Sequence, residues 1–306
     1  MAKTGYSATL IAPAKLNLSL TVLDRRPDGF HDLVSLVAFA DLHDVLSVTL
    51  AETAADQLMV VGPFARSLDR DNLVLKAISA FRDAIEAVPP LSITLHKTVP
   101  VAAGLGGGSA DAAAILRLLA RQHDLAAMAP CIQAIAARLG ADIPVCLESR
   151  CRYMRGTGTT LDPEESGFAC YPALLVNPGV AVPTGAVFGA LAAEQTASTD
   201  TSAPRGLAEG LLAGRNDLEA PAVAVAPEIG PVLSTLSGLP GALGARLSGS
   251  GATCFALFET DGARNRAAEQ FQQIYPAYWI HAGALRNWDE CSLFPRKPTL
   301  SPAPSR

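Results

Sequence analysis

Three consecutive glycines, Gly106, Gly107 and Gly108, precede a segment with a helical apolar stripe and constrain this 306-residue chain more than any other feature. Glycines lose much conformational entropy on folding, so a plain connecting loop rarely uses three in a row. They do let several backbone N–H groups approach one ligand at a helix N-terminus, which carries about half a positive charge. The run predicts a nest for a polyphosphate, with a flexible linker as the alternative.

The sequence after the glycines predicts the helix that such a nest needs. Its apolar residues recur at i, i+3, i+4 and i+7, the spacing of one helix face: Ala112, Ile115, Leu116 and Leu119. Ser109 at the start of this helix is placed either to cap it or to reach a phosphate-bound Mg²⁺. A cap is the simpler interpretation, and both roles can hold together.

The better-known phosphate loops do not fit this stretch. A Walker A loop needs a lysine directly after a glycine, and none of the five lysines follows one. A dinucleotide fingerprint needs a third glycine where Ser109 stands. The protein-kinase motifs H-R-D and D-F-G are absent, because Asp28-Gly29-Phe30 has the wrong order. We therefore expect a phosphate loop of another kind.

The rest of the chain predicts a mixed α+β fold in two lobes, because helices are too few for a regular βαβ succession. Expected strands cover residues 8–22 with a break at Pro13, two parts of 33–50, 91–96, 173–177 and 253–258, and expected helices cover 72–87, 129–139 and 263–275. The expected lobes are residues 1–160 and 161–292, followed by a disordered tail at 293–306, with a surface loop at 194–205.

Charge and hydropathy exclude several classes of partner. The net charge of −5 argues against a nucleic-acid-binding surface, so an anion must be held by local features. No apolar run reaches the ~18–20 residues of a membrane span. The N-terminus lacks the apolar region of a signal peptide, so we expect a cytoplasmic protein without membrane contact. The sequence does not separate a monomer from a homodimer.

Cysteine and histidine usage predicts neither disulfides nor a protein-built metal site. Six cysteines are scattered without a C-x-x-C pair, which is typical of reduced thiols in an intracellular protein. Five histidines are equally dispersed. Any metal is therefore expected to arrive with a ligand.

Three motifs resemble those of the GHMP kinases and follow one another in that family's order. The glycine-rich motif is Pro100-Val101-Ala102-Ala103-Gly104-Leu105-Gly106-Gly107-Gly108-Ser109-Ala110. The others are Ala12-Pro13-Ala14-Lys15-Leu16-Asn17-Leu18 and Leu247-Ser248-Gly249-Ser250-Gly251-Ala252. The resemblance implies a two-lobed fold with the active site between the lobes, ATP bound along residues 100–110, and Mg²⁺ held mainly by phosphate oxygens.

Residues 26–31 and 140–144 resemble the GHMP kinases that phosphorylate the 2-hydroxyl of a cytidine diphosphate-linked methylerythritol, a small-molecule substrate of isoprenoid precursor synthesis. Two alternatives stay open. One is a GHMP kinase for mevalonate, homoserine or a sugar. The other is a nucleotide-binding regulator that has lost catalysis, which the presence of both Lys15 and Asp142 argues against.

The resemblance assigns catalytic roles to Asp142 and Lys15. Asp142 would accept the proton of the substrate hydroxyl as its oxygen attacks the γ-phosphorus, a step that depends on positioning because a carboxylate is a weak base. Lys15 would keep that carboxylate ionised and stabilise the developing alkoxide. Without the motifs, a turn aspartate and a solvated lysine would be the default interpretations.

The resemblance also assigns binding residues. Phe30, where the family usually has tyrosine, and Phe188 would stack on the two faces of the cytosine, and His31 would hydrogen-bond its edge. Substrate contacts are further expected from Asn17 and from the third motif, Ser248, Gly249, Ser250 and Gly251. Asn72 and Lys97 match positions near the adenosine, although Asn72 could equally be a helix N-cap.

Overall fold

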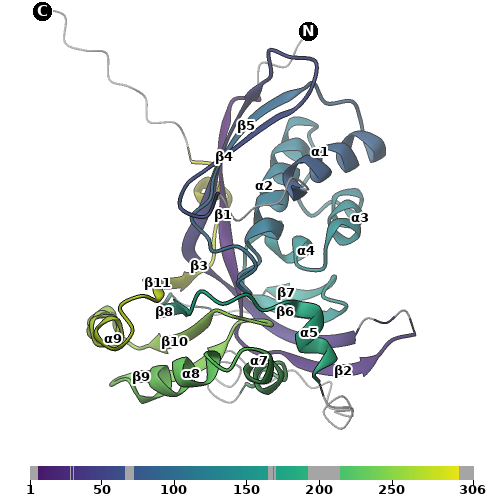
Figure 1. The fold of residues 1–306 in the computed structure, drawn as a ribbon. Coiled ribbons are helices and arrows are strands. Elements are labelled where there is room, and N and C mark those ends of the chain that lie inside the picture. The colour runs from purple at the N-terminus through teal and green to yellow at the C-terminus, as the bar shows by residue number, and fades with distance from the viewer. Residues whose placement is uncertain are drawn as a thin grey trace, which may run out of the picture.

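In the computed structural model, which describes residues 6–27, 29, 31–65, 72–164, 168, 170–191 and 214–295, one sheet runs through the whole molecule (Figure 1). Its eleven described strands are β1 (Ala8–Asn17), β2 (Thr21–Arg25), β3 (His31–Leu50), β4 (Gln57–Val61), β5 (Leu91–His96), β6 (Arg152–Gly156), β7 (Thr160–Glu164), β8 (Tyr171–Asn177), β9 (Ala242–Leu247), β10 (Cys254–Phe258) and β11 (Trp279–Arg286). The order is β4-β5-β3-β11-β8-β10-β9, with β1, β2 and β6 also paired to β3 and with β7 beyond β6. The α+β class is thus confirmed.

Helices cover the sheet in two groups. The described helices are α1 (Leu73–Ala84), α2 (Gly107–Gln122), α3 (Pro130–Leu139), α4 (Ile143–Cys146), α5 (Thr184–Gly189), α7 (Glu219–Val225), α8 (Ile229–Gly238), α9 (Asp261–Ile274) and α10 (Glu290–Leu293). Figure 1 shows α1–α4 beside the upper part of the sheet and α7–α9 beside the lower part. None of the described helices has the length and apolar character needed to cross a membrane.

Strand β3 lies at the centre of the strand pairing, and its continuity differs from what the sequence predicted. The polar residues Asp41 and Asp44 predicted a break into two strands, but β3 continues for 20 residues. Both carboxylates have partners that let the strand continue: Asp41 accepts from His281, and Asp44 pairs with Lys97. A polar residue within a strand is tolerated when its hydrogen bonds are satisfied.

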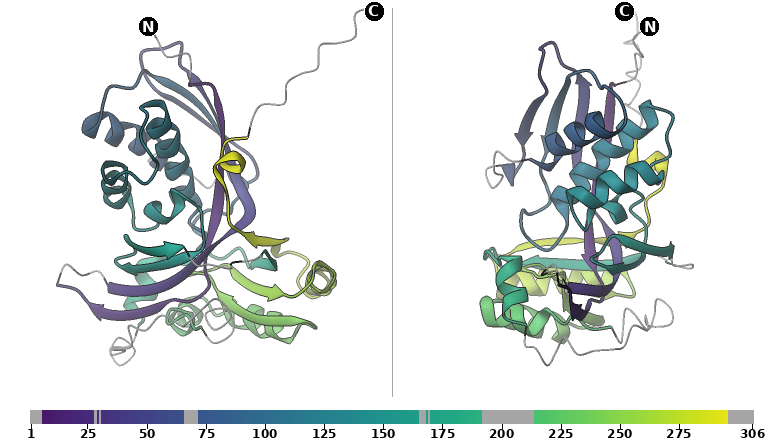
Figure 2. Two further views of the ribbon diagram at one scale, coloured as in Figure 1. Left: turned by 180° about the vertical axis from the view of Figure 1, so that it is seen from behind. Right: turned by 90° about the vertical axis from the view of Figure 1, so that its right-hand side faces the viewer.

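Strands β1 and β3 connect the two halves of the molecule, as both views of Figure 2 show. They pair antiparallel along almost all of β1, with a register shift between Pro13 and Lys15. This bulge lies at the proline that predicted an interruption, because proline lacks the N–H that a regular ladder needs. Strand β3 pairs with strands of both halves, so the sheet itself marks no boundary between two lobes. The lobe limits of 1–160 and 161–292 therefore stay a prediction.

Three apolar cores hold the layers together. The first packs α1, α2 and α3 on β1, β3 and β5, and the second packs α7, α8 and α9 on β8, β9 and β10. The third fills the space between β1, β3, β6 and β8. Strand β8 is apolar at successive positions because Leu174 and Val176 face the second core while Ala173 and Leu175 face the third.

The predicted helices are confirmed with small differences at their ends. The segment 72–87 forms α1, 129–139 forms α3, and 263–275 forms α9. Asn72 caps α1, because its Oδ1 accepts a hydrogen bond from the Val74 N–H at 2.9 Å. The surface loop expected at 194–205 lies outside the described residues. The expected start of a disordered tail at residue 293 is wrong, because Leu293 ends α10 and is buried in the first core. The rest of that expected tail, residues 296–306, lies outside the described residues.

Candidate active site

A cleft of about 1260 Å³ lies where the three motifs meet. Predicted site residues that line it are Lys15, Asn17, His31, Lys97, Pro100, Val101, Ala102, Ala103, Gly104, Leu105, Gly106, Gly107, Gly108, Ser109, Asp142, Phe188, Gly249, Ser250 and Gly251. Ala110, Asn72 and Ser248 are not on its wall, and Phe30 lies outside the described residues. The structure thus brings almost all of the described candidates to one place.

The glycine-rich loop ends at the N-terminus of α2. Gly106 is the N-cap with φ of 59°, a left-handed conformation that glycine adopts without strain. Because the helix begins at Gly107, Ser109 lies inside its first turn, and the interpretation of Ser109 as the cap is wrong. The first N–H groups of a helix have no partner within it, and Gly107, Gly108 and Ser109 at the start of α2 line the cleft, so this end of the helix is suited to an anion.

Gly106 also packs closely against Lys15. A Cβ on Gly106 would lie 3.3 Å from both Cβ and Cε of Lys15 and 3.7 Å from Oδ2 of Asp142. The nest therefore rests directly on the two predicted catalytic residues. A side chain here would crowd the ion pair.

Lys15 and Asp142 form an ion pair with 3.0 Å between Nζ and Oδ2. The Lys15 side chain is only 4% exposed, whereas Asp142 keeps 34% exposure and faces the cleft. Lys15 comes from β1, just after the bulge, and Asp142 is the residue before α4. The geometry gives a carboxylate that is open to a ligand and backed by a buried cation.

Asn17 links this pair to the other motifs. Its Oδ1 accepts from Lys15 Nζ at 2.9 Å, and its Nδ2 donates to Ser35 Oγ at 2.8 Å. Ser248 Oγ in turn accepts from the Asn17 N–H at 3.2 Å and donates to the Gly104 carbonyl at 2.8 Å. Ser248 therefore joins all three motifs from behind the cleft wall.

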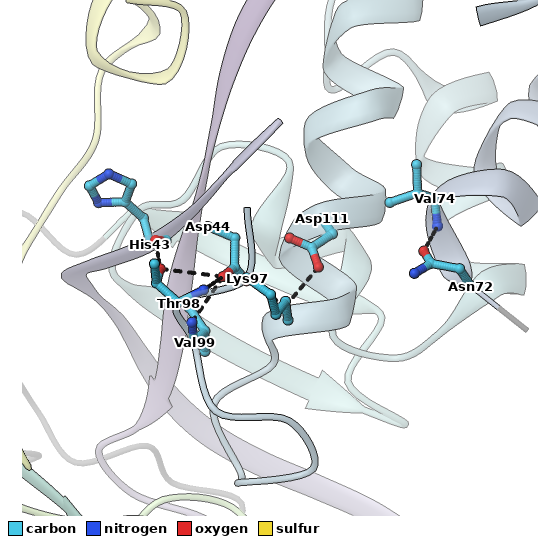
Figure 3. Close-up of polar contacts among 8 residues, drawn as sticks. All are labelled: His43, Asp44, Asn72, Val74, Lys97, Thr98, Val99 and Asp111. Atoms are coloured by element: carbon cyan, nitrogen blue, oxygen red, sulfur yellow. Dashed lines mark hydrogen bonds and ion pairs between the residues drawn. The ribbon is translucent and has the colours of Figure 1, made fainter. Parts of the chain in front are cut away.

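Lys97 is part of a buried charge cluster (Figure 3) that lies next to the start of α2. Its Nζ pairs with Asp44 and lies 2.7 Å from Asp111 Oδ2 on α2. Burial lowers the lysine pKa, but the two carboxylates outweigh it and hold that pKa above its usual value. The second oxygen of Asp44 accepts from the N–H groups of Thr98 and Val99 at 2.6 and 2.9 Å, which fixes the chain leading into the loop.

Asp111 is the member of this cluster whose hydrogen-bonding capacity is least satisfied. Burial and the charge of Asp44 raise its pKa to about 7, against the opposing effect of Lys97. Its Oδ1 is buried without a hydrogen-bond partner among the described residues. A Cβ on Gly107 would lie 3.0 Å from Lys97 Nζ, so the cluster supports the nest from below.

The far side of the cleft carries the aromatic and hydroxyl residues. The rings of His31 and Phe188 stack with 5.1 Å between centroids and 20° between planes. Partial burial, with a smaller effect of Arg25, lowers the pKa of His31. The hydroxyls of Ser250 and Thr184 are 2.9 Å apart, which ties the third motif to the start of α5.

Sequence reasoning missed Asp44 and Asp111 as partners of Lys97. One signal was present: Asp111 precedes Ile115 by four residues and therefore lies on the apolar stripe of the predicted helix. An acid on a buried stripe needs a cationic partner. The described residues contain no group of three or more His, Cys, Asp or Glu side chains that could hold a metal ion.

Comparisons with known proteins identify relatives of this chain. The family model for the GHMP kinases N terminal domain matches residues 72–150, and the model for the GHMP kinases C terminal domain matches residues 196–277. A 4-diphosphocytidyl-2-C-methyl-D-erythritol kinase of Rhodopseudomonas palustris is 46% identical over 290 residues, covering 90% of this chain and 97% of that protein. The enzyme of the same name from Methylorubrum extorquens is 46% identical over 293 residues, covering 90% and 98%.

Solved structures extend the likeness to the fold. A crystal structure of 4-(cytidine 5'-diphospho)-2C-methyl-D-erythritol kinase has a TM-score of 0.71 and 35% identity, covering 92% of this chain and 100% of that one. A homoserine kinase from Cytophaga hutchinsonii has a TM-score of 0.67 at 18% identity, covering 94% and 96%, which shows the shared fold alone. With sequence likeness over nine tenths of its length and its three motifs gathered on one cleft, the chain belongs to the GHMP kinases.

Proposed function

We propose that this kinase transfers the γ-phosphoryl group of ATP to the 2-hydroxyl of 4-diphosphocytidyl-2-C-methyl-D-erythritol, acting in the cytoplasm. The names of its relatives at about 45% identity support the substrate. The 3.0 Å ion pair of Lys15 and Asp142, at the edge of a glycine nest, is the observation that carries the chemistry. The assignment of individual residues below is part of the same proposal.

Asp142 serves as the base in this mechanism. Its carboxylate is one third exposed and faces the cleft, so a substrate hydroxyl can reach it. The hydroxyl proton moves to Asp142 as the oxygen bonds to the γ-phosphorus and the bond to the β–γ bridging oxygen breaks, leaving ADP. Proton transfer must accompany P–O bond formation, because a carboxylate does not deprotonate an alcohol in advance.

Lys15 supports this transfer electrostatically. It is held by Asp142 and by Asn17 Oδ1, so its ammonium has a defined direction before a substrate binds. A preorganised cation in a site with little water stabilises developing negative charge more strongly than one in solution. Its burial behind the nest keeps water from competing for that charge.

The nest at the start of α2 binds the ATP phosphates through backbone N–H groups. Glycine at position 106 fits this role, because a Cβ there would lie 3.3 Å from Lys15 and 3.7 Å from Asp142 Oδ2 and would crowd the ion pair beside the nest. Mg²⁺ would arrive with ATP and be held mainly by phosphate oxygens, and the Ser109 hydroxyl, which lines the cleft, is the side chain that would reach it. When bound, it neutralises charge on the transferring phosphoryl group.

His31 and Phe188 bind the cytosine. Two rings stacked at 5.1 Å leave no space for a third ring between them, so a base that stacks on this face of Phe188 must displace the imidazole. An imidazole that moves off this face can still offer its two ring nitrogens to the edge of the base. Its lowered pKa favours the neutral ring, which presents one donor and one acceptor to a pyrimidine.

A steady-state assay of ADP release tests the proposal. The purified chain is assayed with Mg²⁺–ATP and the cytidine substrate, and in parallel with mevalonate, homoserine and galactose. We expect turnover with the cytidine substrate alone. Turnover of another acceptor would favour a different GHMP kinase, and ATP binding without turnover of any would favour a silent regulator.

Asp142→Asn tests the base. Its kcat should fall by about 10²–10⁴-fold while ATP affinity stays nearly constant, since general-base catalysis contributes that range. Asp162→Asn is the matched control, because it removes a partly exposed carboxylate paired with Arg155 and off the cleft wall. Near-normal turnover of Asp142→Asn would overturn the assignment.

A further inference from the structure

Arg117 is a buried arginine in the middle of α2 that the mechanism above does not use. The residue is 4% exposed and lies on the helix that begins at the glycine nest. Burial lowers the pKa of its guanidinium to about 10, which still leaves the group protonated at neutral pH. A charge has therefore been placed within the apolar core behind the active site.

The guanidinium donates to two backbone carbonyls from different elements. Its Nη1 bonds the Cys146 carbonyl of α4 at 2.6 Å, and its Nη2 bonds the Ile11 carbonyl of β1 at 2.6 Å. Ile11 precedes Lys15 by four residues, and Cys146 follows Asp142 by four residues. The same side chain thus holds the two backbone segments that carry the catalytic ion pair.

Stability alone does not account for an arginine here. Among the described residues, the hydrogen-bond partners of Arg117 are these two carbonyls and no carboxylate, and its Nε is buried without a partner. A buried arginine without a carboxylate partner carries the desolvation cost of its charge without the Coulombic gain of an ion pair. What the guanidinium adds is a rigid planar fork whose two donors fix the separation of the two carbonyls.

We propose that Arg117 is a positioning residue that sets the distance between Lys15 and Asp142 by holding β1 and α4 on α2. The inference rests on the proposed function, in which that pair acts on the substrate hydroxyl. Helix α2 also begins at Gly107, so its rigid body relates the phosphate nest to both members of the pair. An error of about 1 Å in such a geometry can cost on the order of 10²-fold in rate.

The test compares Arg117→Met and Arg117→Lys with Leu119→Ala. Met keeps the length without donors, whereas Lys keeps the charge but not the fork. Leu119 is fully buried on the same helix and in the first core, so its truncation disturbs packing without touching these carbonyls. Each variant is assayed with ATP and the cytidine substrate at a temperature where its thermal melt shows it folded.

We expect kcat of Arg117→Met to fall by about 10²-fold and that of Arg117→Lys by about tenfold, with KM for ATP within about twofold of wild type. Leu119→Ala should lose stability but keep kcat. Arginine variants with kcat equal to that of the control, or with losses in KM alone, would overturn the inference. If Arg117→Met does not fold, the kcat of Arg117→Lys decides in the same way. Failure of the wild-type chain to turn over the substrate would instead contradict the proposed function.

Discussion

Gly104 is the point where the glycine-rich loop touches the third motif most closely. Its φ is +76°, and a Cβ there would lie 2.2 Å from the Ser248 carbonyl oxygen and 3.0 Å from that of Gly251. Both obstacles are backbone atoms, so no side-chain rotation can relieve them. Gly104→Ala is therefore a perturbation with a defined direction: it pushes the two loops apart.

The expected magnitude follows from the contact distances. Raising the Ser248 contact from 2.2 Å to at least 3.0 Å requires a shift of about 0.8 Å, enough to break the 2.8 Å hydrogen bond from Ser248 Oγ to the Gly104 carbonyl. The left-handed conformation costs a non-glycine residue about 1–2 kcal/mol, the lost hydrogen bond about 1 kcal/mol, and overpacking about 1–3 kcal/mol. Together they predict a loss of about 3–6 kcal/mol in the free energy of unfolding.

Urea unfolding and ADP release measure the two consequences. Gly179→Ala is the matched control, because Gly179 has a similar φ of +79° but a Cβ there would have no neighbour within 4 Å. It should lose only the conformational part, about 1–2 kcal/mol, and keep wild-type kcat. Gly104→Ala should lose about 10–100-fold in kcat, because the loop it displaces carries the nest. Equal losses of stability and activity in the two variants would refute the steric reasoning.

Three further predictions concern the buried charges and the aromatic pair. The raised pKa of Asp111, about 7 in the folded state against 3.8 unfolded, means that folding binds a proton, so this group's stabilisation is lost as pH rises from about 4 to 7. Urea melts at each pH should show that the stability of Asp111→Asn relative to wild type rises by up to about 4 kcal/mol as pH increases across this window. A difference between the two proteins that stays constant with pH would contradict this prediction. Lys97→Met leaves the carboxylates of Asp44 and Asp111 unpaired and should cost about 3–5 kcal/mol in urea unfolding, so a loss below about 1 kcal/mol would argue against the cluster. His31→Ala should raise KM for the cytidine substrate about tenfold in initial-rate assays while KM for ATP stays near wild type, and Phe188→Leu should follow the same pattern. Equal changes in both KM values would argue against a contact between His31 and the cytosine.

Local patterns predicted much of the fold and most of the candidate site. The helix after the glycines, the strand at 91–96 and the helix at 129–139 all have strong periodicity over short stretches, and the structure has them. The continuity of β3 through Asp41 and Asp44 could not be predicted, because it depends on partners 240 and 53 residues away. The local sequence indicates that burying a carboxylate is energetically unfavourable, but it does not identify the distant side chain that offsets this cost.

The amino-acid sequence by itself predicted the chemistry: a glycine-rich loop suited to phosphates, a lysine and an aspartate that the family resemblance marks as catalytic, and a net charge that argues against a nucleic-acid-binding surface. These predictions depend on residue type and on spacing over a few positions, which can be recognised in the sequence without a structure. Only the tertiary structure decided that Lys15 and Asp142 lie 3.0 Å apart, that Lys97 is neutralised in a buried cluster, and that Arg117 holds β1 and α4 together. Those distances arise where segments far apart in the chain pack against one another, and packing is a property of the whole chain.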